Sequence, residues 1–446
     1  MRDQNPVLTQ KRSTTTILSK FTQYFMRYER PQTKALRERL AEAPRFITIV
    51  AGPRQVGKTT LVRAALTDVA SQFIAVDQYG EPPSRPPFGF VAESTTELPG
   101  APRDAAWLIR QWQRAREACK AHRTRHEDQP FVLAIDEIQK IPRWSEVVKG
   151  LWDADRAANL PMHVILLGSS PLLMQKGLTE SLTGRYELIP LTHWSYPEMQ
   201  EAFDFALDEY VYFGGYPGSA PFIREEERWR NYVLGSLVQP SIDTDILQMT
   251  RVDKPALLKQ LFTLGCSYSG QILALGKVKG ELEDAGNETT LAGYLDLLGH
   301  AGLLVGLHKY HRGVARQRKS PPKFNVLNTA LMSSAMPYTF AQARADRSHW
   351  GRLVESAVGA HLCNTAGSTE QVHYWRESPH EVDFVISDAQ RLTAIEVKST
   401  TRQGALDGLQ AFTNQHPHCR RLLVGAGGVP LTEFLSYPLS HWLEPA

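Results

Sequence analysis

Short apolar runs alternate with amphipathic stretches between Phe46 and about Leu191. Apolar runs separated by helical patterns are typical of a parallel α/β sheet covered on both faces. We expect a helix over 31–43 before the first strand. A second, long helix is expected through WLIRQWQRAREACKAH, between two of the strands in the sequence. A Pro-rich surface loop, EPPSRPPFGF, is expected between the strands. The runs that we expect to form the strands are FITIVAG, FIAVD, FVLAIDE, HVILLGS and YELIPL.

The pattern changes in the second half of the chain. It is helical from Pro197 to about Gln248, with a break at FGGYPG. Two or three short helices then precede TTLAGYLDLLGHAG and the apolar strand GLLVGLHKY, an order that predicts a winged helix with TTLAGYLDLLG as recognition helix. After Lys323 we expect a strand (KFNVL), a helix around Glu355, and the strands VHYW, EVDFVIS and LTAIEVKS, hence a mixed α/β domain.

Composition narrows the class of protein. Of the 446 residues, 42% are hydrophobic and 22% charged, as in soluble globular proteins. No apolar run reaches the roughly 18 to 20 residues that a bilayer span needs, and the N-terminus has no signal-peptide core. The four cysteines are scattered without metal spacing. We therefore expect a cytoplasmic protein with no membrane partner and with reduced cysteines.

A basic segment is the main feature of the charge distribution. The net charge is only +3, but KYHRGVARQRKSPPK, between Lys309 and Lys323, holds six Lys or Arg and no acid. Such a block is usually a solvated loop. It can also neutralise phosphates of a nucleic acid.

One motif predicts a nucleotide site. Gly52-Pro-Arg-Gln-Val-Gly57-Lys58-Thr59 fits the P-loop pattern, with an apolar strand before it and the helix TTLVRAAL after it. Glycines let the backbone N–H groups approach the phosphates, and the helix N-terminus adds partial positive charge there. We expect Lys58 to bridge the β- and γ-phosphates of ATP and Thr59 to ligate Mg²⁺. The residues expected to contact nucleotide are Gly52, Pro53, Arg54, Gln55, Val56, Gly57, Lys58, Thr59 and Thr60.

The run FVLAIDE is expected to complete this site. Four or five apolar residues lead into Asp136 and Glu137, as in a buried strand that presents carboxylates at its C-terminal end. We expect Asp136 to hold Mg²⁺ and Glu137 to orient and polarise the attacking water. An ordinary pair of acids at a strand end is the alternative.

Several hallmarks together carry a family resemblance. They are AGPRQVGKTTL, AIDEIQKIPRW, LLGSSPLL, SLTGRYELIPL, GRLVESAV, EVDFVI and AIEVKS. With them the chain resembles the AAA+ ATPases, in particular predicted prokaryotic ATPases that join an AAA+ module to a nuclease-like domain. The resemblance implies sensor-1 roles for Ser169 and Ser170 and an arginine finger at Arg185. A finger acts across a subunit boundary, which implies a homo-oligomer, with a hexamer as the expected form; a structural, helix-capping Arg185 is the alternative.

A second set of polar residues lies near the C-terminus. Glu396 and Lys398 are two apart on an expected strand, so they share a face, and a hairpin can bring Asp383 beside them. This resembles the PD-(D/E)xK nuclease core, which implies that Asp383, Glu396 and Glu355 bind Mg²⁺ and that Lys398 activates water. Gln410, on the next helix, matches a Gln found in some members. A solvated hairpin face, or a nuclease-like domain that binds DNA without cutting it, are the alternatives.

These elements predict an α/β chain: a P-loop AAA+ parallel sheet with a helical lid, a winged helix and a mixed α/β nuclease-like domain. The expected divisions are 1–17 (disordered), 18–196 (AAA+ core), 197–250 (lid), 251–320 (winged helix with basic wing) and 321–446 (nuclease-like).

The leading functional hypothesis is an ATP-driven motor that remodels or translocates DNA, branched DNA included. A nucleotide-gated signalling or defence switch, and an ATP-regulated Mg²⁺-dependent nuclease, are the alternatives. Candidate DNA contacts are Lys277, Lys279, Arg312, Arg316, Arg318 and Lys319.

Overall fold

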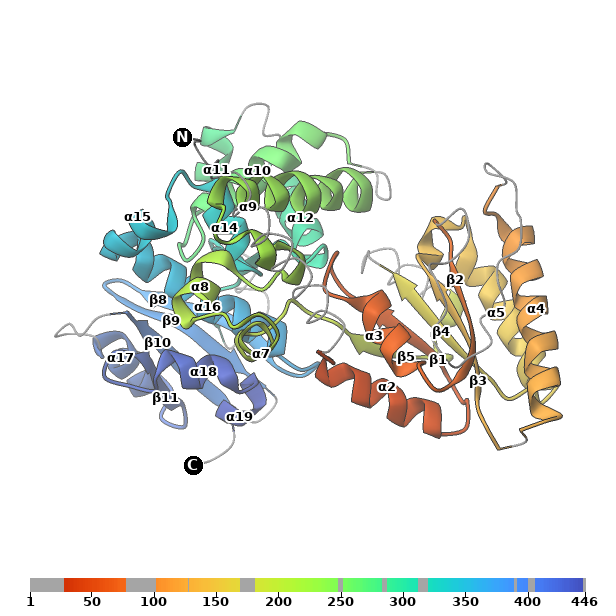
Figure 1. Ribbon diagram of the computed structural model, residues 1–446. Helices are drawn as coiled ribbons and strands as arrows, with labels where there is room; N and C mark the ends of the chain where they lie inside the picture. Colours follow the sequence, from red (N-terminus) through yellow and green to blue (C-terminus); the bar gives the residue numbers. More distant parts are fainter. Residues whose placement is uncertain are drawn as a thin grey trace, which may run out of the picture. The chain divides into compact units, whose positions relative to one another are not determined.

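The computed structural model shows two compact units, Glu29–Leu191 and Thr192–Ala446, the latter with Tyr28 (Figure 1). We call them the N-terminal unit and the C-terminal unit. The expected disordered N-terminus and the Pro-rich loop lie outside the described residues. The structure describes residues 28–77, 102–126, 128–168, 181–247, 252–282, 287–311, 320–388, 391–399 and 406–443.

The N-terminal unit is built on a five-stranded sheet in the order β2-β3-β4-β1-β5. All neighbouring strands are parallel, which confirms the predicted sheet. The second strand begins at Ala70, three residues before the apolar run FIAVD, because its first residues pair with Phe131 and Val132 of β3. The strands are β1 Ile47–Ala51, β2 Ala70–Ala75, β3 Phe131–Asp136, β4 Met162–Gly168 and β5 Tyr186–Pro190.

Helices cover both faces of this sheet. Successive side chains of its central strands point to opposite faces, and because both sets are apolar, each face needs a covering layer. Ile49 of β1 belongs to the apolar cluster with Trp107 and Trp112. The next residue, Val50, belongs to the cluster with Leu36 on the other face. The helices are α2 Pro31–Ala41, α3 Lys58–Ala65, α4 Ala105–Arg123 and α5 Trp144–Ala157, with a 3-10 turn at Ile138–Lys140.

The C-terminal unit begins with helices: α7 Tyr196–Phe203, α8 Leu207–Phe213, a 3-10 helix Pro217–Phe222, α9 Glu226–Tyr232, and π-helices Val233–Val238 and Ser241–Ile246. Then follow α10 Pro255–Ser267, α11 Leu275–Glu281, α12 Glu288–His300 and an antiparallel hairpin of β6 Leu304–Leu307 with β7 Lys323–Val326. Three helices continue the chain: α14 Thr329–Ala335, α15 Phe340–Ala345 and α16 Arg347–Thr365.

A four-stranded sheet in the order β11-β10-β9-β8 completes this unit. The predicted hairpin is confirmed, since β9 and β10 are antiparallel with Phe384 opposite Ile395. An additional strand, β11, pairs in parallel with β10. The elements are β8 Gln371–Glu377, β9 His380–Ser387, β10 Leu392–Lys398, α17 Asp407–Gln415, β11 Arg420–Gly425, α18 Leu431–Ser436 and α19 Leu439–Leu443.

One apolar core runs through most of the C-terminal unit. It joins Trp229 of α9, Leu261 of α10 and Leu298 of α12 with Phe324 of β7 and Phe384 of β9. The division of this unit into lid, winged helix and nuclease-like domain remains a prediction. No helix in the described part of the chain is long and apolar enough to cross a bilayer.

A buried histidine makes the C-terminal unit sensitive to acid. His361 of α16 is 5% exposed, its Nε2 lies 2.9 Å from the Tyr437 carbonyl oxygen, and burial lowers its pKa to about 4. The unfolded chain takes up this proton near pH 6.5 but the folded unit does not, so stability falls as the pH drops from about 6.5 to 4. We expect roughly 2–3 kcal/mol of pH-dependent loss from this group. Urea unfolding at pH 7 and pH 4.5 should show a smaller loss in His361→Gln, and an unchanged loss in the exposed control His300→Gln.

Candidate functional site

The P-loop connects the carboxyl end of β1 to the start of α3. Two of its residues have left-handed backbone: Gln55 at φ 58° and Gly57 at φ 90°. Gly57 directly precedes α3, so the first N–H groups of that helix face the loop. The loop thus combines the N–H groups of a helix start with a sharp turn, the arrangement that binds phosphate.

Lys58 holds its ammonium group inside this loop. Its Nζ donates to the carbonyl oxygens of Gly52 at 2.9 Å and Pro53 at 2.8 Å, and the residue is 7% exposed. The cation is therefore fixed at the centre of the turn. Of the other P-loop residues, Gln55 and Thr60 are exposed and Val56 is buried.

Thr59 and Asp136 meet, although they are 77 residues apart in the sequence: the Thr59 hydroxyl donates to Asp136 Oδ2 at 2.6 Å. β1 and β3 are not adjacent, because β4 lies between them. Asp136 is 6% exposed, and burial raises the pKa of its carboxyl, with an opposing effect from Thr59. A hydroxyl and a buried carboxylate side by side are the oxygen ligands that suit Mg²⁺.

Glu137 is held by two residues that the sequence reading did not select. Gln139 Nε2 donates to Glu137 Oε2 at 2.7 Å, and Lys140 Nζ lies 3.5 Å from the same oxygen. Lys140 also contacts Asp77 Oδ2 at 2.7 Å. Burial acts to lower the pKa of Lys140, but its contacts with Asp77 and Glu137 outweigh burial and raise it. Gln139 and Lys140 lie two and three residues after Glu137, within the AIDEIQKIPRW hallmark, which is the sequence signal for them.

Arg30 is a further residue that the sequence reading missed. It is 5% exposed, and its Nη1 donates to the Val56 carbonyl oxygen at 3.0 Å. This hydrogen bond from the buried guanidinium holds the P-loop backbone in place at Val56. Nothing in the sequence before Pro31 indicates this contact.

Gly52 has no room for a side chain. A Cβ at this position would lie 1.9 Å from the carbonyl oxygen of Leu191. We expect Gly52→Ala to displace the P-loop and weaken ATP binding by roughly 10- to 100-fold, from an overpacking cost of about 1–3 kcal/mol. Fluorescent-nucleotide titration measures this. Gly150→Ala is the matched control, because a Cβ there meets nothing within 4 Å; equal binding by both variants would contradict the prediction.

Arg185 lies at the other end of the sheet. It precedes β5, whose first residue pairs with Ile47, whereas the P-loop follows Ala51 at the far end of β1. A five-residue strand separates the two edges by roughly 16 Å. Arg185 makes two bonds to Asp153 of α5, at 2.8 and 3.0 Å. Of the predicted sensor residues, Ser169 and Ser170 lie outside the described residues; the preceding Gly168 pairs with Ala51.

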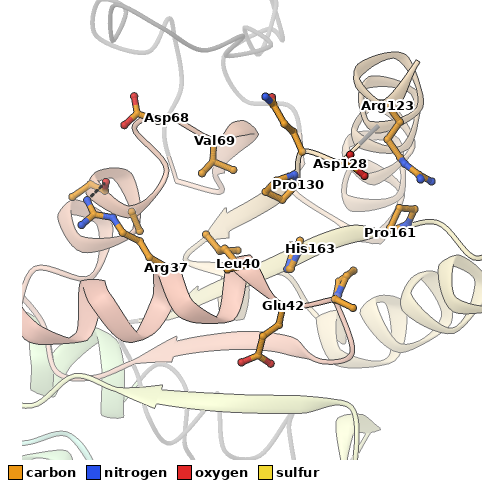
Figure 2. Close-up of a pocket in the computed structure, with 16 residues that line it drawn as sticks. Arg37, Leu40, Glu42, Asp68, Val69, Arg123, Asp128, Pro130, Pro161 and His163 are labelled. Carbon is orange, nitrogen blue, oxygen red and sulfur yellow. Dashed lines mark hydrogen bonds between the residues drawn. The ribbon is translucent and has the colours of Figure 1, made fainter. Parts of the chain in front are cut away.

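A hollow of about 640 Å³ opens at the amino ends of the strands (Figure 2). Leu40 of α2, Pro130 before β3 and His163 of β4 line it. The P-loop lies at the opposite edge of the sheet, and none of its residues lines the hollow. The hollow is therefore separate from the nucleotide site.

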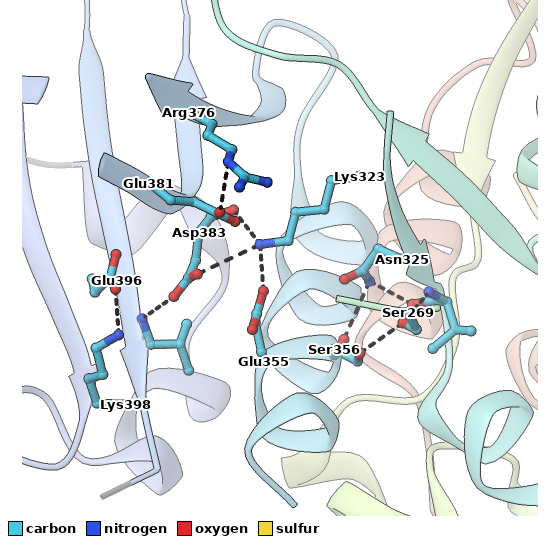
Figure 3. A network of polar contacts seen from close by, with 12 residues as sticks. Ser269, Lys323, Asn325, Glu355, Ser356, Arg376, Glu381, Asp383, Glu396 and Lys398 are labelled. Carbon is cyan, nitrogen blue, oxygen red and sulfur yellow. Dashed lines mark hydrogen bonds and ion pairs between the residues drawn. The ribbon is translucent and has the colours of Figure 1, made fainter. Parts of the chain in front are cut away.

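The C-terminal polar residues also come together. Asp383 Oδ2 accepts from the backbone N–H of Val397 at 2.8 Å, and Lys398 Nζ donates to Glu396 Oε1 at 2.5 Å. The predicted helix around Glu355 is α16, and Gln410 lies on α17, where its Nε2 donates to Asn414. A lysine not predicted for this site, Lys323, contacts Glu355 (Figure 3).

The predicted DNA contacts are described only in part. Lys277 and Lys279 are exposed on α11. Arg312, Arg316, Arg318 and Lys319 lie outside the described residues. Lys323, the last cation of the basic segment, is fully buried, so it does not face a phosphate backbone. The exposed face of α12 carries Glu288 and Asp296, and the helix has no Lys or Arg.

Comparisons with known proteins agree with the P-loop geometry. Residues 44–200 match the family described as AAA domain. Residues 204–342 and 350–434 match two families described as domains of unknown function, DUF8612 and DUF4143. The chain is thus a P-loop ATPase with an AAA domain.

Its relatives extend beyond that domain. Over 376 residues the chain is 25% identical to the uncharacterized proteins Rv2008c of Mycobacterium tuberculosis and Mb2031c of Mycobacterium bovis, covering 82% of this chain and 73% of each relative. Among solved structures it is similar to the Walker-type ATPase PABY2304 of Pyrococcus abyssi, with TM-score 0.46, 15% identity, and coverage of 68% of this chain and 94% of that one. A single-residue variant of RuvB from Thermotoga maritima aligns with TM-score 0.29 and 16% identity over 65% of this chain and 94% of that one.

Proposed function

We propose that this ATPase uses ATP hydrolysis to remodel or translocate DNA, and that it does so as a homo-oligomer, with a hexameric ring as the expected form. The observation that carries the hydrolytic part is the 2.6 Å bond between Thr59 and Asp136 beside the buried Lys58. It brings a hydroxyl, a carboxylate and an ammonium to one end of a phosphate-binding loop.

The roles at this site follow from the positions of the side chains. The P-loop N–H groups and Lys58 bind the phosphates, and Glu137, held by Gln139 and Lys140, orients and polarises the attacking water. Thr59 and Asp136 fit Mg²⁺, because both present oxygen and already share a hydrogen bond. When bound there, Mg²⁺ neutralises charge on the phosphates.

The position of Arg185 supports the oligomer. It lies roughly 16 Å from the P-loop edge of its own sheet, so its guanidinium serves the nucleotide of a neighbouring copy. In this proposal Arg185 leaves Asp153 when subunits assemble. We expect Arg185→Ala to lower turnover of the assembled protein by roughly 10³-fold while ATP binding is retained.

The DNA part of the proposal is supported by the two exposed lysines of α11, Lys277 and Lys279. Leu273, two residues before α11, donates its N–H to the carbonyl oxygen of Pro322, so the α11 lysines lie close to the end of the basic segment. The order of the elements supports a winged helix. It is α10, the bridge between Ile272 and Lys323, α11, α12 and the β6–β7 hairpin. The acidic face of α12 argues that α11 and the basic segment, rather than α12, contact the phosphates.

DNA-stimulated ATP hydrolysis tests this proposal. Wild type should bind a four-way junction with an affinity that falls as salt rises, and DNA should raise its turnover. The double variant Lys277→Ala/Lys279→Ala should bind several-fold more weakly and show a shallower salt dependence. Lys34→Ala, an exposed lysine of the N-terminal unit, is the control. Absence of DNA binding and of DNA stimulation in wild type would end the DNA proposal.

A nucleotide-gated switch is the second candidate, favoured by the Arg185–Asp153 pair. A single chain with its finger residue paired to its own α5 would hydrolyse slowly and keep its nucleotide. Protein purified as a monomer with ADP bound, and with turnover indifferent to DNA, would favour the switch over the motor.

A further inference from the structure

Lys323 is the most deeply buried cation of the C-terminal unit's polar site. It is the first residue of β7, its side chain is 0% exposed, and its Nζ lies 4.7 Å above the ring centre of Phe384. Figure 3 shows its ammonium group between the carboxylates of Glu355 and Asp383. A buried ammonium of this kind is stable only if its surroundings compensate its charge.

The contacts of Lys323 are with the residues that the nuclease resemblance assigns to Mg²⁺. Its Nζ is 2.5 Å from Glu355 Oε1, 3.7 Å from Asp383 Oδ1, and donates to the main-chain oxygen of Asp383 at 3.0 Å. Those oxygens converge on the ammonium nitrogen. A metal ion placed there would overlap the lysine.

The remaining carboxylate oxygens are mostly engaged as well. Asp383 Oδ2 is taken by the N–H of Val397 and Glu396 Oε1 by Lys398. Only Glu396 Oε2, among the oxygens of these three carboxylates, is buried without a hydrogen-bond partner. Mg²⁺ binds through one or two carboxylates and completes its coordination with water, but here the oxygens of Glu355 and Asp383 that would hold it already surround the Lys323 ammonium. Within the described residues no three Asp, Glu, His or Cys side chains gather as a metal site requires.

We propose that Lys323 occupies the cation position of this carboxylate site, so that the C-terminal unit uses a built-in ammonium in place of a divalent metal and does not cut DNA. The residues present do not fit Mg²⁺. The contacts of Lys323 instead link the start of β7 to Asp383 of β9 and Glu355 of α16. The basic segment ends at the same point of β7. This inference is independent of the proposed DNA motor, because it concerns only metal binding by the C-terminal unit.

The basic segment is fixed at both ends by the same sheet. Tyr310 donates its N–H to the Tyr374 carbonyl oxygen at 2.7 Å, and the Tyr374 hydroxyl donates to the carbonyl oxygen of Pro321. Lys323, two residues after Pro321, enters the carboxylate site. The ammonium thus replaces the metal ion chemically and serves as a fixed attachment for the strand that ends the segment.

Manganese binding to nucleotide-free, full-length protein tests the inference. All variants carry Asp136→Asn, which silences the P-loop metal position. With Lys323 present, electron paramagnetic resonance of free Mn²⁺ should show no ion bound at the C-terminal site below millimolar concentration. Lys323→Met keeps the apolar stem and frees the oxygens of Glu355 and Asp383 beside Glu396, so it should gain one Mn²⁺ per chain with at least a 10-fold higher affinity. Adding Glu355→Gln should remove that gain.

Two results would overturn the inference. The first is one Mn²⁺ bound per chain while Lys323 is present and lost in Glu355→Gln; Mg²⁺-dependent DNA cleavage by wild type that Lys398→Ala abolishes would have the same meaning. The second is no gain of Mn²⁺ in a folded Lys323→Met chain, which would show that the ammonium does not occupy a cation position. If Lys323→Met fails to fold by circular dichroism, Lys323→Gln replaces it, and Mn²⁺ binding by the Lys323 chain still decides whether the site takes a metal.

Discussion

Glu137→Gln should lower ATP turnover by roughly 10²- to 10⁴-fold while leaving ATP affinity within a few-fold of wild type. The amide keeps the size of the side chain but cannot accept a proton from the attacking water. Binding is retained because the P-loop contacts of Lys58 and the Thr59–Asp136 bond are unchanged. Steady-state phosphate release and fluorescent-ATP titration measure the two effects separately.

The control for this variant is Glu146→Gln on α5. Glu146 forms an exposed pair with Arg143, is 54% exposed, and has no part in the site. Its turnover should equal that of wild type. A Glu137→Gln enzyme that kept a third or more of wild-type turnover would show that another group activates the water.

Lys323→Met should destabilise the C-terminal unit by about 3–5 kcal/mol, because it leaves carboxylates buried without their counter-charge. The methionine keeps the length and apolar character of the stem, so most of the loss reports the missing charge, including its contact with the Phe384 ring. The double variant Lys323→Met/Glu355→Gln should recover a large part of this stability, since the closest carboxylate is then neutral. Urea unfolding of the three proteins gives the free energies of unfolding.

Lys259→Met is the matched control for that experiment. Lys259 pairs with Asp243 at 2.7 Å but is 48% exposed. Exposed pairs contribute about 0–1 kcal/mol, so this variant should unfold almost like wild type. Equal losses in Lys259→Met and Lys323→Met would contradict a special role for the buried ammonium.

The sequence predicts well those parts of the fold that local patterns determine. The apolar runs locate all five strands of the N-terminal sheet, most clearly β1, β3 and β4, which are buried on both faces and therefore apolar nearly throughout. Strand β11 escapes this reading, since RRLLVG begins with two charged residues and resembles a loop. The P-loop and the Asp-Glu pair can be recognised in the sequence because each consists of a few consecutive residues.

Residues that act through distant contacts could not be found in this way. Lys323 ends a basic run, which indicates a solvent-exposed side chain, and its burial is decided by Glu355 and Asp383 much later in the chain. Arg30 likewise reaches Val56 only once α2 has packed beside α3. Arg185 is the opposite case: the motif identifies the residue, but its partner Asp153 lies on a separate helix.

Leu191 ties the phosphate-binding turn to the point where the chain leaves the N-terminal unit. Its N–H bonds the Ala51 carbonyl oxygen at 2.8 Å, and its own carbonyl group fills the space beside Gly52. The next residue, Thr192, already belongs to the C-terminal unit. A shift of the turn would therefore move the junction peptide, and we expect nucleotide binding to be felt first at this peptide bond.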